Sequence, residues 1–528
     1  MSTEVALTIV LLAAVALLVV AQFTRIPYPI LLVLGGLGLG AIPSLPEVVL
    51  EPEVVLVVIL PPLLYAAAYF TPLRELRRNV GPISVLAIGL VLATMLVVAV
   101  VAHEALDFGW PESFVLGAIV SPTDPVAATA IARRLNVPTR IVTIVEGESL
   151  INDGTALVAY KFAVAAVVTG SFSLIEASGD FVLSVLGGVA VGIVVGAMIA
   201  WVRRRIEAPA VEVTIALFSG FFAYLPAEAI HVSGVLAAVT VGIYMGRLTS
   251  VLTNPTTRIQ GNAVWEIVQF LLNSALFILI GLQLPGVLDG IGALDRSEVI
   301  VDGALIAATV IVIRLLWVFP FTYVPRLLIP RMDGPAPPWQ HTLLVAWTGM
   351  RGAVSLAAAL ALPLSTDAGA SFPHRDLIIF CAFSVILATL LIQGLTLPPL
   401  IRLLGIDDTD ETLEREEADA RLRAAEAALA RLEELTGEDW VREDTAERVA
   451  GMYRYRHRRF SARFGEGEGA DDDFDYEGRS ESYQRLTREL LEAQRSTLIE
   501  MRNSGEINDD VLRVLERELD LEDSRLEI

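Results

Sequence analysis

The sequence predicts an all-α polytopic membrane protein with about thirteen transmembrane helices and a helical cytoplasmic tail. Three observations support this fold class. Hydrophobic residues make up 54% of the 528 residues, they gather in long blocks between Met1 and Leu404, and most of the net negative charge follows Leu404. A transmembrane helix needs roughly 17 to 25 apolar residues, and shorter segments are tolerated where protein packs around them.

Thirteen blocks meet this requirement. We expect helices at residues 4–22, 27–42, 52–70, 80–102, 112–133, 141–169, 179–203, 210–229, 232–246, 262–285, 299–325, 339–364 and 375–403. The first block begins with Glu4, and no basic residue precedes it. It therefore reads as a retained helix, because the start of a secretory signal is positively charged.

The distribution of arginines predicts the orientation of these helices. With the N-terminus outside, the inner connections hold fifteen arginines, whereas the outer connections hold only Arg296 and Arg375. Cytoplasmic loops of membrane proteins carry the excess of basic residues. The sequence thus predicts a plasma (inner) membrane protein with its C-terminus in the cytoplasm. The bias also supports an odd number of helices, since one missed helix would reverse it.

The tail differs sharply from the membrane region. Residues 405–528 contain 36 acidic and 19 basic residues, a net charge of −17. Its segments show helical spacing of apolar residues with many charge pairs, except for an acidic linker near residues 465–480 that we expect to be disordered. We therefore predict a transmembrane domain at 1–404 and a mostly helical tail at 405–528. The negative charge argues against nucleic acid as a partner.

The segment SPTDPVAATAI, which begins at Ser121, predicts an interrupted helix. Pro122 and Pro125 have no backbone N–H, so a helix here should unwind near Thr123 and Asp124. Unwound backbone at membrane depth must line a cavity or be buried in protein. Free carbonyls beside a carboxylate and a hydroxyl suit a small cation. The alternative is a structural kink whose polar residues satisfy one another.

The segment GESLINDGTALVAYKF carries a second group of polar residues. On a helix, Ser149 and Asp153 are one turn apart, as are Glu148 and Asn152. Asp153 can hold a proton or a monovalent cation but not both, which is the requirement for exchanging one against the other. For Glu148, a structural pairing with a basic residue is the credible alternative.

The segment GMRGAVSLA predicts a second interruption. Arg351 lies between Gly349 and Gly352, where a buried guanidinium needs a carboxylate and the glycines permit unwinding. The two interrupted segments are the fifth and the twelfth, and their odd separation predicts an inverted-topology repeat that brings both interruptions to one site.

Two further basic residues lie in apolar segments. Lys161 is the only lysine and stands roughly 12 Å along the helix from Asp153. We expect it to pair structurally or snorkel, the alternative being a transport-coupled amine. Arg314 is likewise expected to be structural. The histidines show no metal-ligand spacing, so no cofactor is predicted.

Taken together, LPPLLYAAAYF, SPTDPVAATA, EGESLINDGTALV and GMRGAVSLA resemble, in order and spacing, the monovalent cation:proton antiporters of the NhaP and NHE type. The resemblance covers residues 1–404 and implies an inverted-repeat core, a homodimer and electroneutral exchange of Na⁺ or a similar ion for a proton. It also implies that Asp153 is the shared carboxylate and that Ser149 and Thr123 add oxygen ligands for Na⁺.

The same resemblance implies that Asn152 and Asp124 shape the site and that Glu148 pairs with Arg351. Many relatives have an acid at the position of Ala66, so the third helix here lacks that carboxylate. The partners implied are the cation, the proton and membrane lipid. A K⁺ or Li⁺/H⁺ antiporter of the same fold and a cation channel remain alternatives. An intramembrane enzyme is not expected, because the serines have no histidine at matching depth.

Overall fold

The computed structural model describes residues 3–24, 26–42, 54–170, 174–292, 296–328, 337–406, 411–462 and 476–524. The chain divides into two compact units, Met1–Asp408 and Thr409–Ile528. In the described ranges the regular secondary structure is helical, apart from one isolated bridge between Ser365 and Ser371.

The first unit is built from helices that occupy each of the thirteen predicted segments. They are α1 (Thr3–Phe23), α2 (Tyr28–Gly40), η1 (Val54–Ile59), α3 (Leu60–Phe70), α4 (Leu73–Arg78), α5 (Val80–Ser84), η2 (Val85–Leu90), α6 (Val91–Ala105), α7 (Trp110–Val120), α8 (Pro125–Arg134), α9 (Thr139–Thr169), α10 (Leu174–Arg203), α11 (Pro209–Ala229), α12 (Gly234–Leu252), α13 (Pro255–Leu282), α14 (Leu284–Gly290), α15 (Arg296–Leu328), α16 (Trp339–Trp347), α17 (Ala353–Leu360), α18 (Arg375–Ala388), η3 (Thr389–Gln393) and α19 (Gly394–Leu404).

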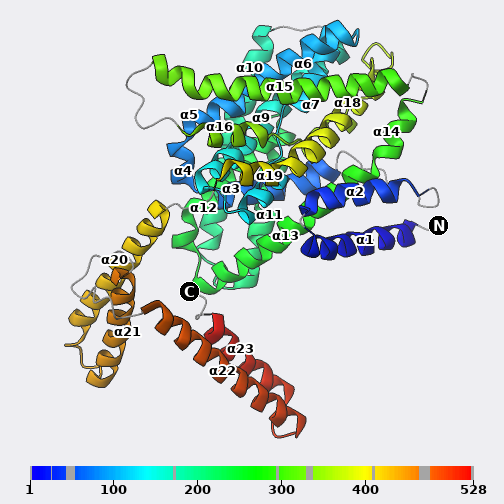
Figure 1. Cartoon of the computed structure of the whole chain (residues 1–528). Helices are drawn as coiled ribbons and strands as arrows, with labels where there is room; N and C mark the ends of the chain where they lie inside the picture. The colour runs from blue at the N-terminus through cyan, green and yellow to red at the C-terminus, as the bar shows by residue number, and fades with distance from the viewer. Residues whose placement is uncertain are drawn as a thin grey trace. The chain divides into compact units, whose positions relative to one another are not determined.

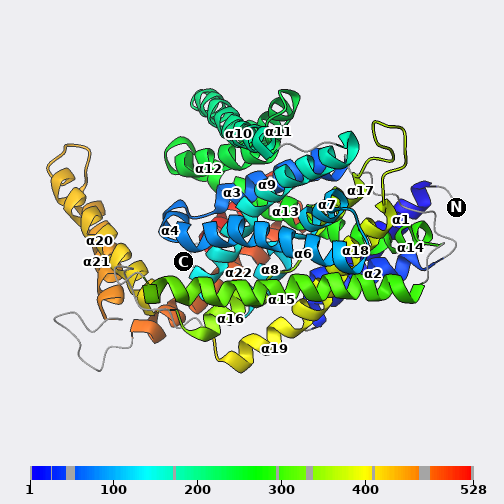
Figure 2. The ribbon, with the colours of Figure 1, turned by 90° about the horizontal axis from the view of Figure 1, so that it is seen from above.

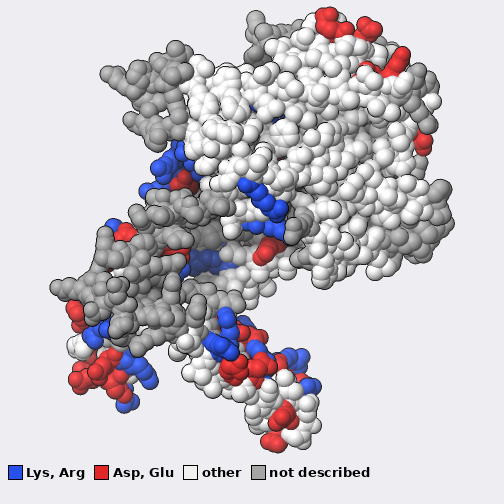
Figure 3. Space-filling model, in the orientation of Figure 1, with Lys and Arg blue, Asp and Glu red and all other residues white. Residues whose placement is uncertain are grey.

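Nine helical stretches among the described residues are long and apolar enough to cross a membrane, and three shorter apolar helices accompany them. In Figure 3 the surface of this unit is almost free of charged side chains over a broad area. This surface fits a bilayer, because ionisable groups facing lipid are costly. The all-α membrane fold class is thereby confirmed.

The helices of the first unit pack closely against one another. Figure 1 shows α1 and α2 as neighbours, and α2 packs on α13. Figure 2 shows α10, α11 and α12 on one side of the unit and α15, α16 and α19 on the opposite side. Where α2 meets α13, a Cβ on Gly36 or Gly281 would collide with backbone of the other helix. Small residues at such contacts let membrane helices approach closely.

Both predicted interruptions are present, and both lie inside the helical bundle. The first separates α7 from α8 at residues 121–124, and the second separates α16 from α17 at residues 348–352. The π-helical turns η1, η2 and η3 were not predicted from the sequence. Each extends an apolar helix by a wider turn, a distortion that hydropathy alone does not reveal.

The second unit consists of two helix pairs. Helix α20 (Glu411–Leu435) packs on α21 (Glu443–Ala462), and α22 (Tyr476–Asn503) packs on α23 (Asp509–Ser524). The second pair buries apolar side chains that include Leu491 of α22 and Leu519 of α23. An ion pair of 2.6 Å between Arg495 and Asp520 also joins the two helices. Of the linker predicted near 465–480, residues 465–475 lie outside the described residues, whereas 476–480 belong to α22.

Candidate functional site

The two interrupted helices meet at their breaks. The backbone N–H of Asp124 donates to the carbonyl of Met350 at 2.8 Å, and the Arg351 Nε donates to the carbonyl of Val120 at 3.0 Å. A backbone group in each interruption, which has no partner within its own helix, is thus hydrogen-bonded by a residue of the other interruption. Unwound backbone at this depth is satisfied within the protein, as a membrane interior requires.

Asp124 provides negative charge where two helices begin. Its carboxylate accepts a hydrogen bond from the N–H of Val126 at 2.9 Å and thereby caps α8. The same carboxylate lies against Gly352 and Ala353, at the start of α17. Because helix N-termini carry partial positive charge, one carboxylate stabilises both half-helices. A Cβ at Gly352 would collide with that carboxylate, so only glycine fits there.

Arg351 provides positive charge at the opposite helix ends. Its guanidinium donates to the carbonyls of Val120, which ends α7, and of Gly349. Its backbone N–H donates to Thr389 Oγ1 at 3.1 Å. The guanidinium thus compensates open carbonyls instead of bonding a carboxylate. The prediction that Glu148 pairs with Arg351 is wrong in this structure.

Glu148 pairs with Arg314 instead. The Arg314 Nη1 and Nη2 atoms lie 2.5 and 2.8 Å from the two oxygens of the Glu148 carboxylate, and both side chains are buried. Arg314 also donates to the carbonyls of Val345 and Ala346, in the last turn of α16. The planar guanidinium matches the carboxylate with two parallel bonds while its remaining donors reach the helix end. Arg314 thus forms the kind of buried pairing that is expected of a structural arginine.

Three of the predicted site residues, Glu148, Ser149 and Asn152, gather around a fourth, Thr123, in the first break. Asn152 Nδ2 donates to Thr123 Oγ1 at 2.8 Å, and Ser149 Oγ lies 3.2 Å from the same oxygen. Thr123 Oγ1 is also 3.4 Å from a Glu148 oxygen. The Asn152 amide thus fixes the threonine hydroxyl, while its own Oδ1 is buried and has no hydrogen-bond partner within the described ranges.

Asp153 differs from the other two acids at the crossing. It is 8% exposed, and no hydrogen bond or ion pair holds its carboxylate in the part of the chain that the structure describes. Together with Thr123 and Ser149 it lines a cavity of about 370 Å³. The lining also includes Arg133, whose side chain is 70% exposed and pairs with Glu146 at 2.8 Å, so the cavity reaches the surface at that end.

Several lining residues were not anticipated from the sequence. Ser355, at the start of α17, has a buried hydroxyl with no hydrogen-bond partner among the described residues, and Glu146 and Glu266 bring further carboxylates to the same cavity. Glu146 could have been identified as a candidate lining residue from the sequence, because it stands two residues before Glu148 in a polar segment. Helix α3 contributes Ala66 and other uncharged side chains to the lining, in keeping with the missing acid.

Lys161 lies away from this cluster. Its Nζ contacts both oxygens of Glu228, at 2.8 and 3.1 Å, and that carboxylate also accepts from the N–H of Gly234. The expected structural pairing of Lys161 is confirmed. Among the described residues no group of three or more His, Cys, Asp and Glu side chains is arranged to hold a metal ion.

Two crossed, interrupted helices, with a carboxylate in a surface-reaching cavity that no described residue pairs with, are the arrangement of a membrane carrier for small ions. The chain belongs to the sodium/hydrogen exchanger family, whose transmembrane region matches residues 9–403. This confirms the predicted resemblance and the predicted class of function, cation:proton antiport.

Individual relatives support the same family assignment. The chain is 37% identical over 531 residues to a Mycobacterium tuberculosis protein named as an uncharacterized Na⁺/H⁺ exchanger, with 98% of this chain and 96% of the relative covered. It is 35% identical over 386 residues to the sodium, potassium, lithium and rubidium/H⁺ antiporter of Bacillus pumilus, with 71% and 57% covered.

The fold also matches a solved structure. The sodium proton antiporter MjNhaP1 from Methanocaldococcus jannaschii aligns with a TM-score of 0.59 at 21% identity, covering 77% of this chain and all of that one. This similarity supports the antiporter fold.

Proposed function

We propose that this antiporter exchanges Na⁺ for H⁺ by competition at Asp153. The observation that carries the proposal is the state of the three acids at the crossing. Glu148 is bonded by Arg314, and Asp124 is bonded by backbone N–H groups. Asp153 has no such partner among the described residues and lies in the cavity. A carboxylate in this position needs a proton or a cation to balance its charge.

The remaining ligands follow from the same geometry. Ser149 and Thr123 line the cavity with hydroxyl oxygens, which are suitable ligands for a small hard cation. The Asn152 amide positions the Thr123 hydroxyl, and the Asp124 carboxylate stabilises the break by capping α8. No covalent bond forms or breaks in this exchange, so the proposed activity is transport without an enzymatic step or a cofactor.

The charge balance supports electroneutral exchange. One carboxylate gains one positive charge whether it binds Na⁺ or H⁺, so the two half-cycles carry equal charge across the membrane. Lys161 is the amine that could upset this balance, and its ion pair with Glu228 removes it from the site.

The orientation sets the side on which the cavity opens. We place the protein in the plasma membrane with its N-terminus outside, because the arginine distribution favours that arrangement. The exposed Arg133 at the cavity mouth then lies on the cytoplasmic side, and the structure is inward-facing. Alternating access requires a second state in which this mouth closes and Asp153 meets the outer side. We also propose the homodimer that the family resemblance implies.

A second candidate is exchange of a wider set of cations, including K⁺ and Li⁺. The Bacillus pumilus relative is named for sodium, potassium, lithium and rubidium. With Ala66 in the lining, the α3 side of the cavity has no carboxylate. An uncharged wall places fewer constraints on which cation can be coordinated there. The flux experiment described next decides between Na⁺ selectivity and this wider selectivity.

The test is proton flux in proteoliposomes containing a pH-sensitive dye, with Na⁺, Li⁺ or K⁺ added in turn. Asp153→Asn should abolish cation-driven flux, because an amide neither releases a proton nor balances a cation. Asp302→Asn is the matched control, since Asp302 lies in α15 and does not line the cavity. Near-normal flux in a folded Asp153→Asn protein would refute the shared carboxylate, and flux that never saturates would favour a channel.

A further inference from the structure

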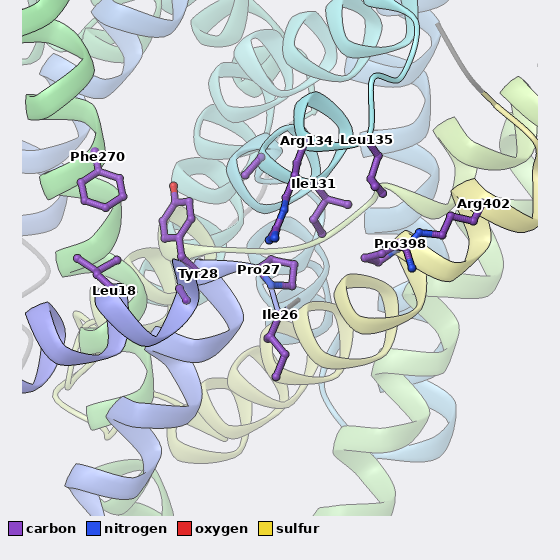
Figure 4. Close-up of a pocket in the computed structure, with 12 residues that line it drawn as sticks. Leu18, Ile26, Pro27, Tyr28, Ile131, Arg134, Leu135, Phe270, Pro398 and Arg402 are labelled. Carbon is purple, nitrogen blue, oxygen red and sulfur yellow. The ribbon is translucent and has the colours of Figure 1, made fainter. Parts of the chain in front are cut away.

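A second cavity, of about 560 Å³, lies apart from the crossing. It is bounded by residues 26–28 at the start of α2, the C-terminal ends of α8 and α19, and the side of α13 (Figure 4). Most of its lining is apolar, including Leu18, Ile131 and Phe270. Among the described residues, the charged members of the lining are Arg134 and Arg402.

The two arginines enter the cavity from different helices. Figure 4 shows Arg134 extending from α8 and Arg402 from α19 into the space beside Pro27 and Pro398. Within the part of the chain that the structure describes, neither guanidinium has an ion-pair or hydrogen-bond partner and no carboxylate lines the cavity. Two unpaired positive charges that face one space repel each other and attract an anion.

Each arginine also lies in the last turn of its helix, where positive charge is favourable on its own. That role accounts for an arginine at either helix end. It does not account for both side chains pointing into one cavity, because neither donates to a helix carbonyl within the described residues. The convergence indicates a shared anionic ligand, and guanidinium groups match phosphate oxygens well.

The surroundings favour a lipid over a soluble anion. Phe23, two residues after Ala21 of the lining, is 86% exposed, and Leu403, the residue after Arg402, is 83% exposed. In a membrane protein, exposed large apolar side chains of this kind face acyl chains. The cavity thus combines a charged end for a headgroup with apolar walls and neighbours for lipid chains.

We propose that this cavity binds the headgroup of an anionic phospholipid, with Arg134 and Arg402 pairing with its phosphate. The lipid comes from the leaflet at the inner ends of the helices, where the proposed orientation places both arginines. Basic pockets between transmembrane helices on the cytoplasmic side are suited to such headgroups. Tyr28, Ala130 and Phe270 line this cavity and the ion cavity alike, so a bound lipid packs against a wall of the transport site.

The test measures lipid binding to the full-length purified protein. Phosphatidylglycerol and phosphatidylcholine with identical acyl chains are titrated separately, and the bound lipid is counted by native mass spectrometry. Arg134→Gln/Arg402→Gln removes both charges. Arg204→Gln/Arg247→Gln is the matched control, because these exposed arginines lie on the same predicted side but outside the cavity. Arg134→Lys/Arg402→Lys keeps the charge and checks that the site tolerates substitution.

We expect the wild type, the control and the lysine variant to prefer phosphatidylglycerol, and the glutamine variant of the cavity to bind it about 30-fold more weakly. Equal weakening in the Arg204 and Arg247 control would show a general surface-charge effect and overturn the proposal. So would unchanged binding by the cavity variant, or equal binding of both lipids. Displacement of the lipid by millimolar inorganic phosphate would assign the cavity to a soluble anion instead.

Discussion

Replacing Arg314 by methionine tests which arginine compensates the buried Glu148. Methionine keeps much of the length of the side chain but removes the charge and its donors. The Glu148 carboxylate then loses both of its short bonds inside the bundle, and the carbonyls at the end of α16 lose theirs. Glu148→Leu is the complementary change, and the double variant completes the cycle.

The magnitudes separate the two possible outcomes clearly. Removing one partner of a buried ion pair costs about 3–5 kcal/mol, so the two single changes sum to about 6–10 kcal/mol. The double variant removes both charges and leaves only the α16 carbonyls without donors, at about 1–3 kcal/mol. The free energy of unfolding of the double variant should therefore fall far less than the sum predicts.

The assay is reversible unfolding of the purified protein in mixed micelles of SDS and a mild detergent, followed by tryptophan fluorescence. A parallel cycle with Glu148→Leu and Arg351→Met is the matched control. Since Arg351 bonds backbone carbonyls instead of Glu148, its cycle should be closer to additive. A larger coupling energy for Arg351 than for Arg314, or an additive Arg314 cycle, would refute the assigned pair.

Three further predictions concern flux in proteoliposomes. Gly352→Ala should abolish exchange and lower the free energy of unfolding by about 1–3 kcal/mol, because the new methyl group meets the Asp124 carboxylate; wild-type flux would contradict this contact. Lys161→Gln should leave flux unchanged and insensitive to an imposed potential, because Lys161 is tied to Glu228; a steep potential dependence would reveal a second titrating group. Deleting residues 409–528 should preserve exchange, because every proposed ligand precedes them; loss of flux in a correctly inserted deletion would show that the tail takes part.

Local sequence features were enough to predict the two interruptions. Pro122 and Pro125 remove backbone donors, and the glycines around Arg351 permit unwinding, so each break depends on a few neighbouring residues. The gathering of Thr123 with Ser149 could be predicted for a related reason. Polar groups at membrane depth must satisfy one another, which leaves few possible arrangements.

The partner of Glu148 could not be predicted in this way. Arg314 and Arg351 are both single arginines in apolar segments, and either could reach a buried acid. The choice depends on the rotation and depth of α15, which packing sets and hydropathy does not report. The same limit applies to Ser355, whose exposure to the ion cavity follows from how α17 is placed.

The hydrogen bonds across the two breaks restrict how this antiporter can move. If one interrupted helix slid past the other, backbone groups would lose their partners in the middle of the membrane, where each loss is expensive. The ion pair between Glu148 and Arg314 joins α9 to α15 and to the end of α16 in the same way. Asp153, on α9, is therefore linked through hydrogen bonds to the breaks at α7–α8 and α16–α17 and to α15, so a displacement of α9 would carry these helices with it. In the proposed exchange, Asp153 and the hydroxyls of Thr123 and Ser149 would then move together, because one hydrogen-bonded framework joins α9 to the first break.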